Sequence, residues 1–151
     1  MTTSSSGESG RPTSATDLPG QSSLDRCALR IARPTSDLRV AEAFWVDGVG
    51  LDVLWRSEPG GPGHQLLMVG FPSAQWHLEL VDDPLVARRR PPSEEDLLVL
   101  YVGGPIPEEL VARICAHGGS RVSARNPYWD QWGVTIEDPD SYRLVLSPRD
   151  W

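Results

Sequence analysis

The sequence lacks an excess of basic residues, has no long apolar run and contains few cysteines, and each lack excludes a class of protein. Basic residues are not in excess, because 14 Lys and Arg stand against 21 Asp and Glu, giving a formal net charge of −7. Nucleic acids and anionic membrane surfaces are bound through a basic face that displaces counterions, so neither partner is expected. No run of apolar residues approaches the roughly 20 that a membrane-spanning helix requires, which excludes that class as well.

Cysteine is also scarce. Cys27 and Cys115 lie far apart in the sequence, so the chain has neither a disulfide framework nor a Cys-x-x-Cys motif. In apolar surroundings both are predicted to be buried free thiols. The N-terminus has neither the basic segment nor the apolar segment of a secretory signal peptide, so a reducing, cytoplasmic location is expected.

The chain itself is long enough for one ordinary domain or two small modules. Residues 1–24 are rich in Ser, Thr, Gly and Pro and nearly without large apolar side chains, which predicts a disordered tail. From residue 25 onwards the hydrophobic pattern is that of a folded domain. The six Trp residues suggest large core side chains, an aromatic cleft, or both. Trp45, Trp55 and Trp76 lie at core spacing within predicted elements and are expected to pack in the core.

Hydrophobic periodicity divides residues 25–151 into two similar halves. In the first, alternation predicts strands at 27–32, 51–56, 65–70 and 76–81, with a helix at 37–46. Pro34 is expected to end the first of these strands. In the second, strands are predicted at 97–102, 121–124, 133–136 and 142–146, with a helix at 107–116. Residues 83–96 contain three Arg followed by prolines and acids, which is typical of a linker.

The order β-α-β-β-β therefore occurs twice, in a module at 25–82 and a module at 97–147. A unit of this size leaves one face of its sheet uncovered, so two units are expected to join their sheets and bury apolar surface between them. The pattern predicts an α+β fold whose paired modules form a curled mixed sheet around a cavity, with the helices outside.

Residues 133–146, Gly-Val-Thr-Ile-Glu-Asp-Pro-Asp-Ser-Tyr-Arg-Leu-Val-Leu, carry a resemblance to a known family. This segment is similar to the closing hairpin of the vicinal oxygen chelate superfamily, the group of glyoxalases, bleomycin-resistance proteins and extradiol dioxygenases, with Ser141 where Gly is usual. Residues 29–35, 76–80, 97–102 and 126–129 extend the similarity, which covers about residues 26–147. It is closest to a small bacterial single-chain subgroup.

The resemblance implies four positions for metal ligands, on the first and last strands of each module. In this sequence they fall on Arg26, Glu79, Leu97 and Val145. One carboxylate, one guanidinium and two aliphatic side chains cannot bind a divalent ion, which needs three or four nitrogen, oxygen or sulfur donors. His77 is a possible displaced ligand, whereas Asp96 would point to the wrong sheet face.

A metal cofactor is accordingly not expected. Glu79 is expected to pair with Arg26 or Arg30, with His77 hydrogen-bonded nearby, since buried charges are normally paired. The first predicted function is the binding of a small organic molecule in a metal-free cavity, as in sequestration of an antibiotic or metabolite. The alternative is a glyoxalase-type metal-dependent lyase, isomerase or dioxygenase in which Glu79 is a ligand or base and His77 assists.

The candidate binding residues combine a few convergent polar groups with aromatic walls, as small-molecule sites do. A homodimer formed through exposed sheet edges is the possible protein partner. The expected ligand-binding side chains are Arg26, Arg30, His77, Glu79, Tyr101, Tyr128, Trp129 and Trp132, the last three from a predicted loop at 127–132.

Overall fold

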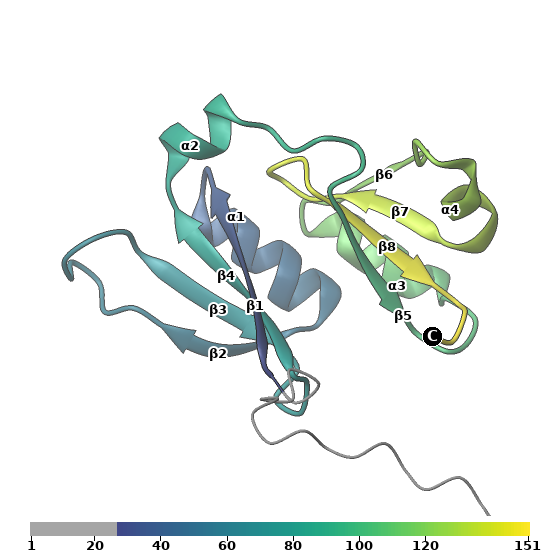
Figure 1. The fold of residues 1–151 in the computed structure, drawn as a ribbon, viewed down its shortest axis with the longest axis horizontal. Coiled ribbons are helices and arrows are strands. Elements are labelled where there is room, and N and C mark those ends of the chain that lie inside the picture. The colour runs from purple at the N-terminus through teal and green to yellow at the C-terminus, as the bar shows by residue number, and fades with distance from the viewer. Residues whose placement is uncertain (1–26) are drawn as a thin grey trace, which may run out of the picture.

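The computed structural model describes residues 27–151, which form two β-α-β-β-β modules beside each other (Figure 1). The α+β class and the pairing of two such modules are confirmed. The predicted tail at 1–24 and the candidate residue Arg26 lie outside the described residues. In the part of the chain from 27 to 151, no helix is long and apolar enough to cross a membrane.

The first module is a four-stranded sheet in the order β1-β4-β3-β2. Strands β1 and β4 are parallel, and the other neighbours are antiparallel. One continuous helical segment, α1 followed by the π-helical η2, covers one face. The elements are β1 (Leu29–Thr35), α1 (Leu38–Glu42), η2 (Ala43–Val49), β2 (Asp52–Arg56), β3 (Leu66–Gly70) and β4 (Trp76–Asp82), followed by the short α2 (Pro84–Arg89).

The second module repeats this arrangement, with strand order β5-β8-β7-β6 and a parallel β5–β8 pair. Helix α3 covers one face of this second sheet, and α4 lies between β6 and β7 in the chain. The elements are β5 (Leu97–Tyr101), α3 (Glu108–Ala116), β6 (Ser120–Val122), α4 (Pro127–Trp132), β7 (Val134–Glu137) and β8 (Arg143–Ser147).

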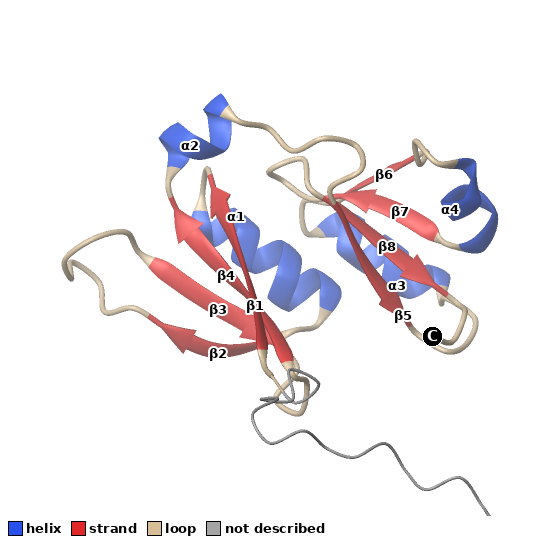
Figure 2. Cartoon of the chain, in the orientation of Figure 1, coloured by secondary structure: helices blue, strands red, loops and turns tan. Residues whose placement is uncertain are grey.

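One hydrophobic core joins the modules. Helices α1 and α3 lie on the same side of the two sheets in Figure 2, and η2 packs directly against α3. Arg113 Nε donates a 2.8 Å hydrogen bond to the Gly48 carbonyl across this contact. The expected continuous curled sheet is instead two separate four-stranded sheets, because the modules meet mainly through their helices.

The closing hairpin of the second module also contacts the first. Asp140 Oδ1 accepts hydrogen bonds from the Ser36 backbone N–H (2.8 Å) and the Ser36 hydroxyl (2.7 Å). Ser141 makes the turn with φ of 69°, a left-handed conformation that favours Gly, the residue usual at this position in the hairpin that the segment resembles. The turn that carries the family resemblance therefore also fastens the two modules together.

Two short helices correct the sequence interpretation. The predicted linker contains α2, which Asp83 caps by accepting from Val86 N at 3.1 Å. The predicted loop at 127–132 is α4, which Asn126 caps by accepting from Tyr128 N at 3.0 Å. Both begin with Pro at the first helical position, where its missing N–H and fixed φ cost nothing. A capping residue followed by Pro therefore starts a helix in both segments, although their polar composition is typical of a loop.

Three smaller expectations are also wrong. Pro34 does not end the first strand, which continues to Thr35; β1 is an edge strand, where a missing N–H is tolerated. Cys27 is exposed rather than buried, and Cys115 is half-buried. Trp55, expected to pack in the core, lies on edge strand β2 with 48% of its surface exposed.

Candidate functional site

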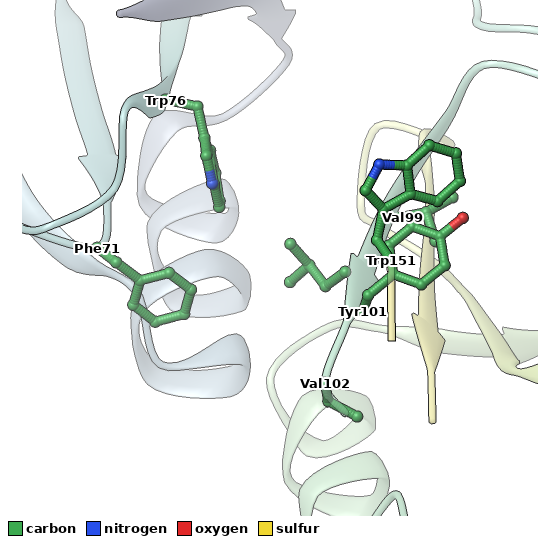
Figure 3. A pocket seen from close by; sticks show the side chains of 7 residues that line it. Phe71, Trp76, Val99, Tyr101, Val102 and Trp151 are labelled. Carbon is green, nitrogen blue, oxygen red and sulfur yellow. The ribbon is translucent and has the colours of Figure 1, made fainter. Parts of the chain in front are cut away.

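An apolar cavity of about 730 Å³ opens between the modules, at the end of the sheets where β4 begins and β5 ends. Its volume lies within the range of about 300 to 1,000 Å³ that is usual for small-molecule sites. In Figure 3, Phe71 and Trp76 face Tyr101, Val102 and Trp151 across the opening. The lining residues are Phe71, Trp76, Val99, Leu100, Tyr101, Val102 and Trp151.

The two walls are aromatic and come from different modules. Phe71 and Trp76 meet edge to face, with ring centroids 6.0 Å apart and planes at 88°. On the other side, Tyr101 lies 5.4 Å from Trp151. The Phe71–Trp76 pair presents apolar surface to the space between the walls, whereas the Trp151 ring, which is 99% exposed, contacts little besides Tyr101.

A polar cluster lies on the uncovered face of the first sheet. Arg30 Nε donates to His77 Nε2 at 3.0 Å, and Arg30 Nη1 donates to Glu79 Oε2 at 3.0 Å. Parallel pairing of β1 with β4 sets Arg30 opposite His77, and alternation puts Glu79 on the same face. The expected pairing of Glu79 with Arg30 is observed, and His77 is hydrogen-bonded nearby, to the same Arg30.

The cluster does not fit the metal that the family resemblance implies. Its two potential ligands, His77 and Glu79, are both engaged by one guanidinium, whose positive charge repels a cation. Between residues 27 and 151, no three His, Cys, Asp or Glu side chains converge as a metal site requires. The arrangement can orient a polar ligand group, but it supplies too few donors for a divalent ion.

Comparison with known proteins agrees with this architecture. Models of the YycE-like N-terminal and C-terminal domains match residues 29–81 and 95–148. The chain belongs to the YycE-like family. The YycE protein of Bacillus subtilis is 34% identical over 126 residues, which are 83% of this chain and 90% of that protein.

Solved structures place this YycE-like chain in the vicinal oxygen chelate superfamily. The crystal structure of Bacillus subtilis YycE, a protein of unknown function, matches with a TM-score of 0.73 and 32% identity over 86% of this chain and 95% of that one. TnmS3, an antibiotic-binding protein from a Streptomyces species, matches with a TM-score of 0.54 and 26% identity over 80% and 93% of the two chains. Glyoxalase I of Leishmania major, at a TM-score of 0.63 and 20% identity over 82% and 87%, shares the fold.

The remaining candidate aromatics of the YycE-like chain gather on the second module. Trp129 lies 6.5 Å from Tyr101 and 4.9 Å from Tyr128. The Arg149 guanidinium stacks 5.0 Å from the Trp132 ring and donates to the Tyr128 hydroxyl at 3.1 Å. Of the predicted binding residues that lie within 27–151, only Tyr101 lines the aromatic cavity.

Sequence reasoning missed most of the cavity wall. No pattern in the sequence indicates Phe71, Val102 or Trp151 as wall residues, and the alternation of its strand predicts Trp76 only as a core residue. Trp76 does pack against the core, but as the first residue of β4 it also extends past the covered part of the sheet into the cavity. An aromatic residue at the end of a core-facing strand was the signal that could have indicated it.

A buried carboxyl group lies at the contact between the modules of the YycE-like chain. Burial raises the pKa of Asp138 to about 6, although backbone N–H groups of Tyr142 and Asp140 donate to it at 2.9 Å and the charge of Arg33 favours its ionised form. Ionisation of Asp138 therefore costs folding free energy. Since the folded-state pKa exceeds the ordinary value of 3.8, this cost develops as pH rises from about 4 to about 6.

Replacing Asp138 with Asn should remove this pH dependence. The amide oxygen can still accept a hydrogen bond, but the side chain does not titrate. We expect the free energy of unfolding of Asp138→Asn, relative to the wild type, to rise by up to about 3 kcal/mol between pH 4 and pH 6.5. Urea denaturation across this range measures it, with Asp52→Asn on exposed β2 as the control. A relative stability that falls with pH would show that Asp138 stabilises the fold in its ionised form.

Proposed function

We propose that this protein encloses a small organic molecule with an aromatic ring system in the cavity between its modules, and binds it without a metal. The observation that carries the proposal is the pair of aromatic walls, Phe71 with Trp76 and Tyr101 with Trp151, facing each other across about 730 Å³. The likeness to TnmS3, an antibiotic-binding protein, supports sequestration of an antibiotic or a comparable metabolite.

The walls favour a planar apolar ligand. Aromatic contacts of suitable geometry contribute roughly 0.5–1.5 kcal/mol each beyond the burial of apolar area. The cavity lining is largely hydrocarbon, so a small, strongly polar ligand would lose hydration without gaining hydrogen bonds. Binding is therefore expected to select for ring area rather than for charge.

A thermal-shift panel tests this function. Doxorubicin, tetracycline and bleomycin carry aromatic rings, whereas fosfomycin has no aromatic ring and is the comparison compound. A ligand at 100 times its Kd stabilises the folded state by about 2.7 kcal/mol, which raises the Tm by several degrees. We expect at least one ring-bearing compound to do so and fosfomycin not to. Stabilisation by fosfomycin alone, or by no compound, would oppose the proposal.

A metal-dependent lyase, isomerase or dioxygenase is the second candidate. The observation in its favour is the convergence of Arg30, His77 and Glu79 on one open sheet face. In such an enzyme Glu79 would be a ligand or the general base. Purified protein would then contain Ni, Zn, Fe or Mn in near-stoichiometric amount, and the metal would be lost in Glu79→Gln. Elemental analysis of both proteins decides between the candidates, since our first proposal expects only trace metal in each.

We also propose that the protein forms a homodimer through β2. This edge strand carries Val53, Leu54 and Trp55, each more than two-fifths exposed, and unpaired edges with apolar side chains favour association. Introducing a charge by Trp55→Lys is expected to shift the protein to monomer at micromolar concentration, measured by light scattering after gel filtration. Arg39→Lys on α1 is the control. A wild type that is already monomeric would contradict this assembly.

A further inference from the structure

Strand β5 forms an open edge of the second sheet. It pairs only with β8, in parallel, so its other side has no partner strand within residues 27–151. Each residue of a parallel strand directs its N–H and C=O to the same side, and successive residues alternate. The Val102 N–H donates to the Ser147 carbonyl at 2.8 Å, so every second residue counted from Val102 bonds to β8. The N–H and C=O groups of Val99 and Tyr101 therefore point away from β8.

This open edge borders the aromatic cavity. Four consecutive residues, Val99 to Val102, line the cavity. Because side chains alternate between the two faces of a strand, a cavity that meets four residues in succession lies along an edge rather than over one face. The opposite edge is occupied by β8, so the cavity lies against the open one. In Figure 3, Phe71 and Trp76 face this part of β5 across the opening.

The open edge supplies hydrogen-bonding groups that the side chains of the cavity do not. None of the seven lining side chains is charged, and most are aliphatic or aromatic. Val99 and Tyr101 each offer one N–H and one C=O, and two residues of a strand span about 6.6 Å. Donor and acceptor pairs at this spacing match the backbone of an extended peptide, which binds to a sheet edge as an added strand.

We propose that the ligand of the aromatic cavity is a short, neutral, aromatic peptide, or a compound with a similar chain of amides, that adds a strand to β5. The inference rests on the function proposed above and specifies the ligand class. Alternate ligand residues exchange backbone hydrogen bonds with Val99 and Tyr101, and their rings lie against Phe71 and Trp76. A volume of about 730 Å³ suits a drug-sized ligand, so the peptide has only a few residues. Its ends are blocked, because a charged terminus would lose hydration without gaining a partner.

Hydrogen exchange at individual backbone amides, measured by NMR, tests the proposal with the capped peptide N-acetyl-Phe-Ala-Phe-amide. In the free protein, the amides of Val99 and Tyr101 should exchange rapidly, whereas those of Leu100 and Val102 are protected by β8. With the peptide at 100 times the Kd measured by isothermal titration, exchange at Val99 and Tyr101 should slow about 100-fold, since these amides exchange only when the site is empty. Exchange at Leu100 should change by less than about twofold.

Methylated peptides distinguish an added strand from simple burial of the rings. Only one edge of an extended peptide can face β5. Methylation of the Ala nitrogen and methylation of the second Phe nitrogen each remove one N–H, from opposite edges of the peptide. We expect one methylated peptide to bind at least about tenfold more weakly than the parent and the other to bind within about threefold. Equal affinity of the two methylated peptides would overturn the proposal.

Val99→Pro removes one of the two proposed donors. Proline is tolerated where the N–H of an edge strand points outwards, as Pro34 does on β1, so this variant should fold. It should bind the peptide at least about tenfold more weakly than the wild type. Ala32→Pro is the matched control, because it makes the same change at an outward position of β1 that does not line the aromatic cavity. If Val99→Pro does not fold, exchange in the wild type decides.

The outcomes separate this inference from the function on which it rests. If a ring-bearing antibiotic binds in the cavity but the peptide does not slow exchange at Val99 and Tyr101, the inference is wrong and the function stands. If neither compound binds, both are wrong. Slow exchange at these two amides in the peptide-free protein would also overturn the inference, because the edge would already be occupied. An increase of that protection with protein concentration would identify the occupant as a second copy of the chain.

Discussion

Replacing Tyr101 with Ala should weaken binding of the best ring-bearing antibiotic in the panel by about 10- to 100-fold. Tyr101 forms one wall of the aromatic cavity, and its ring centroid lies 5.4 Å from that of the exposed Trp151, so the substitution removes one ring and the neighbour of a second. A loss of about 1.4–3 kcal/mol corresponds to this range. Isothermal titration of the folded variant measures it, and Tyr101 is exposed enough (36%) that stability should change little.

Tyr128→Ala is the matched control for this prediction. It makes the same chemical change at a similarly exposed tyrosine (41%) on α4, which does not line the cavity. We expect its affinity to stay within about twofold of the wild type. Equal weakening in the two variants would place the ligand against α4, where the sequence alone predicted contacts at Tyr128, Trp129 and Trp132. That outcome would reject the cavity as the binding site.

Replacing Phe44 with Ala should produce the largest loss of stability, about 3–5 kcal/mol in the free energy of unfolding. Phe44 is fully buried in η2, packs edge to face on Trp45 at 4.9 Å, and reaches towards Gly119 of the second module. The cavity left by its removal would be bordered by both modules. Urea denaturation followed by fluorescence and by circular dichroism gives the free energy and shows whether the two probes change together.

Val40→Ala on the exposed surface of α1 is the control for Phe44→Ala, with an expected change of less than about 1 kcal/mol. Because one core joins the modules, both proteins should unfold in a single cooperative transition. Two separate transitions would mean that the modules fold as independent units. A loss below about 1 kcal/mol in Phe44→Ala would contradict the place of Phe44 in the core.

The fold was largely predictable because its elements follow simple rules. Alternation of apolar residues located the strands, and the repeat of β-α-β-β-β with the hairpin at 133–146 indicated the superfamily. The missed helices are those in which local chemistry outweighs composition. Helices α2 and α4 are short and lie in polar, Pro-containing segments, and the caps Asp83 and Asn126 stabilise their first turns. Trp55 was misassigned because the pattern of a strand does not say whether it lies at the edge of a sheet.

The polar cluster was predictable for a similar reason. Arg30, His77 and Glu79 share one face by parity, and β1 and β4 are neighbours in the fold that the resemblance implies. A cavity with Tyr101 in its wall was predictable, but most of its other aromatic residues were not. Its residues come from the ends of strands and turns in both modules, so they meet only because η2 packs on α3 and sets the distance between the sheets. Such packing between modules leaves no periodic signal in the sequence.

Titration of a ring-bearing antibiotic into protein stripped of metal by a chelator tests the central claim most directly. Isothermal titration of the stripped protein, the untreated protein and Glu79→Gln should give the same affinity within about twofold, with one ligand per chain. Such a result is expected because the binding surface is aromatic and Glu79 is held by Arg30. The account would be contradicted if chelation abolished binding, a divalent ion restored it, and Glu79→Gln did not bind the antibiotic at all.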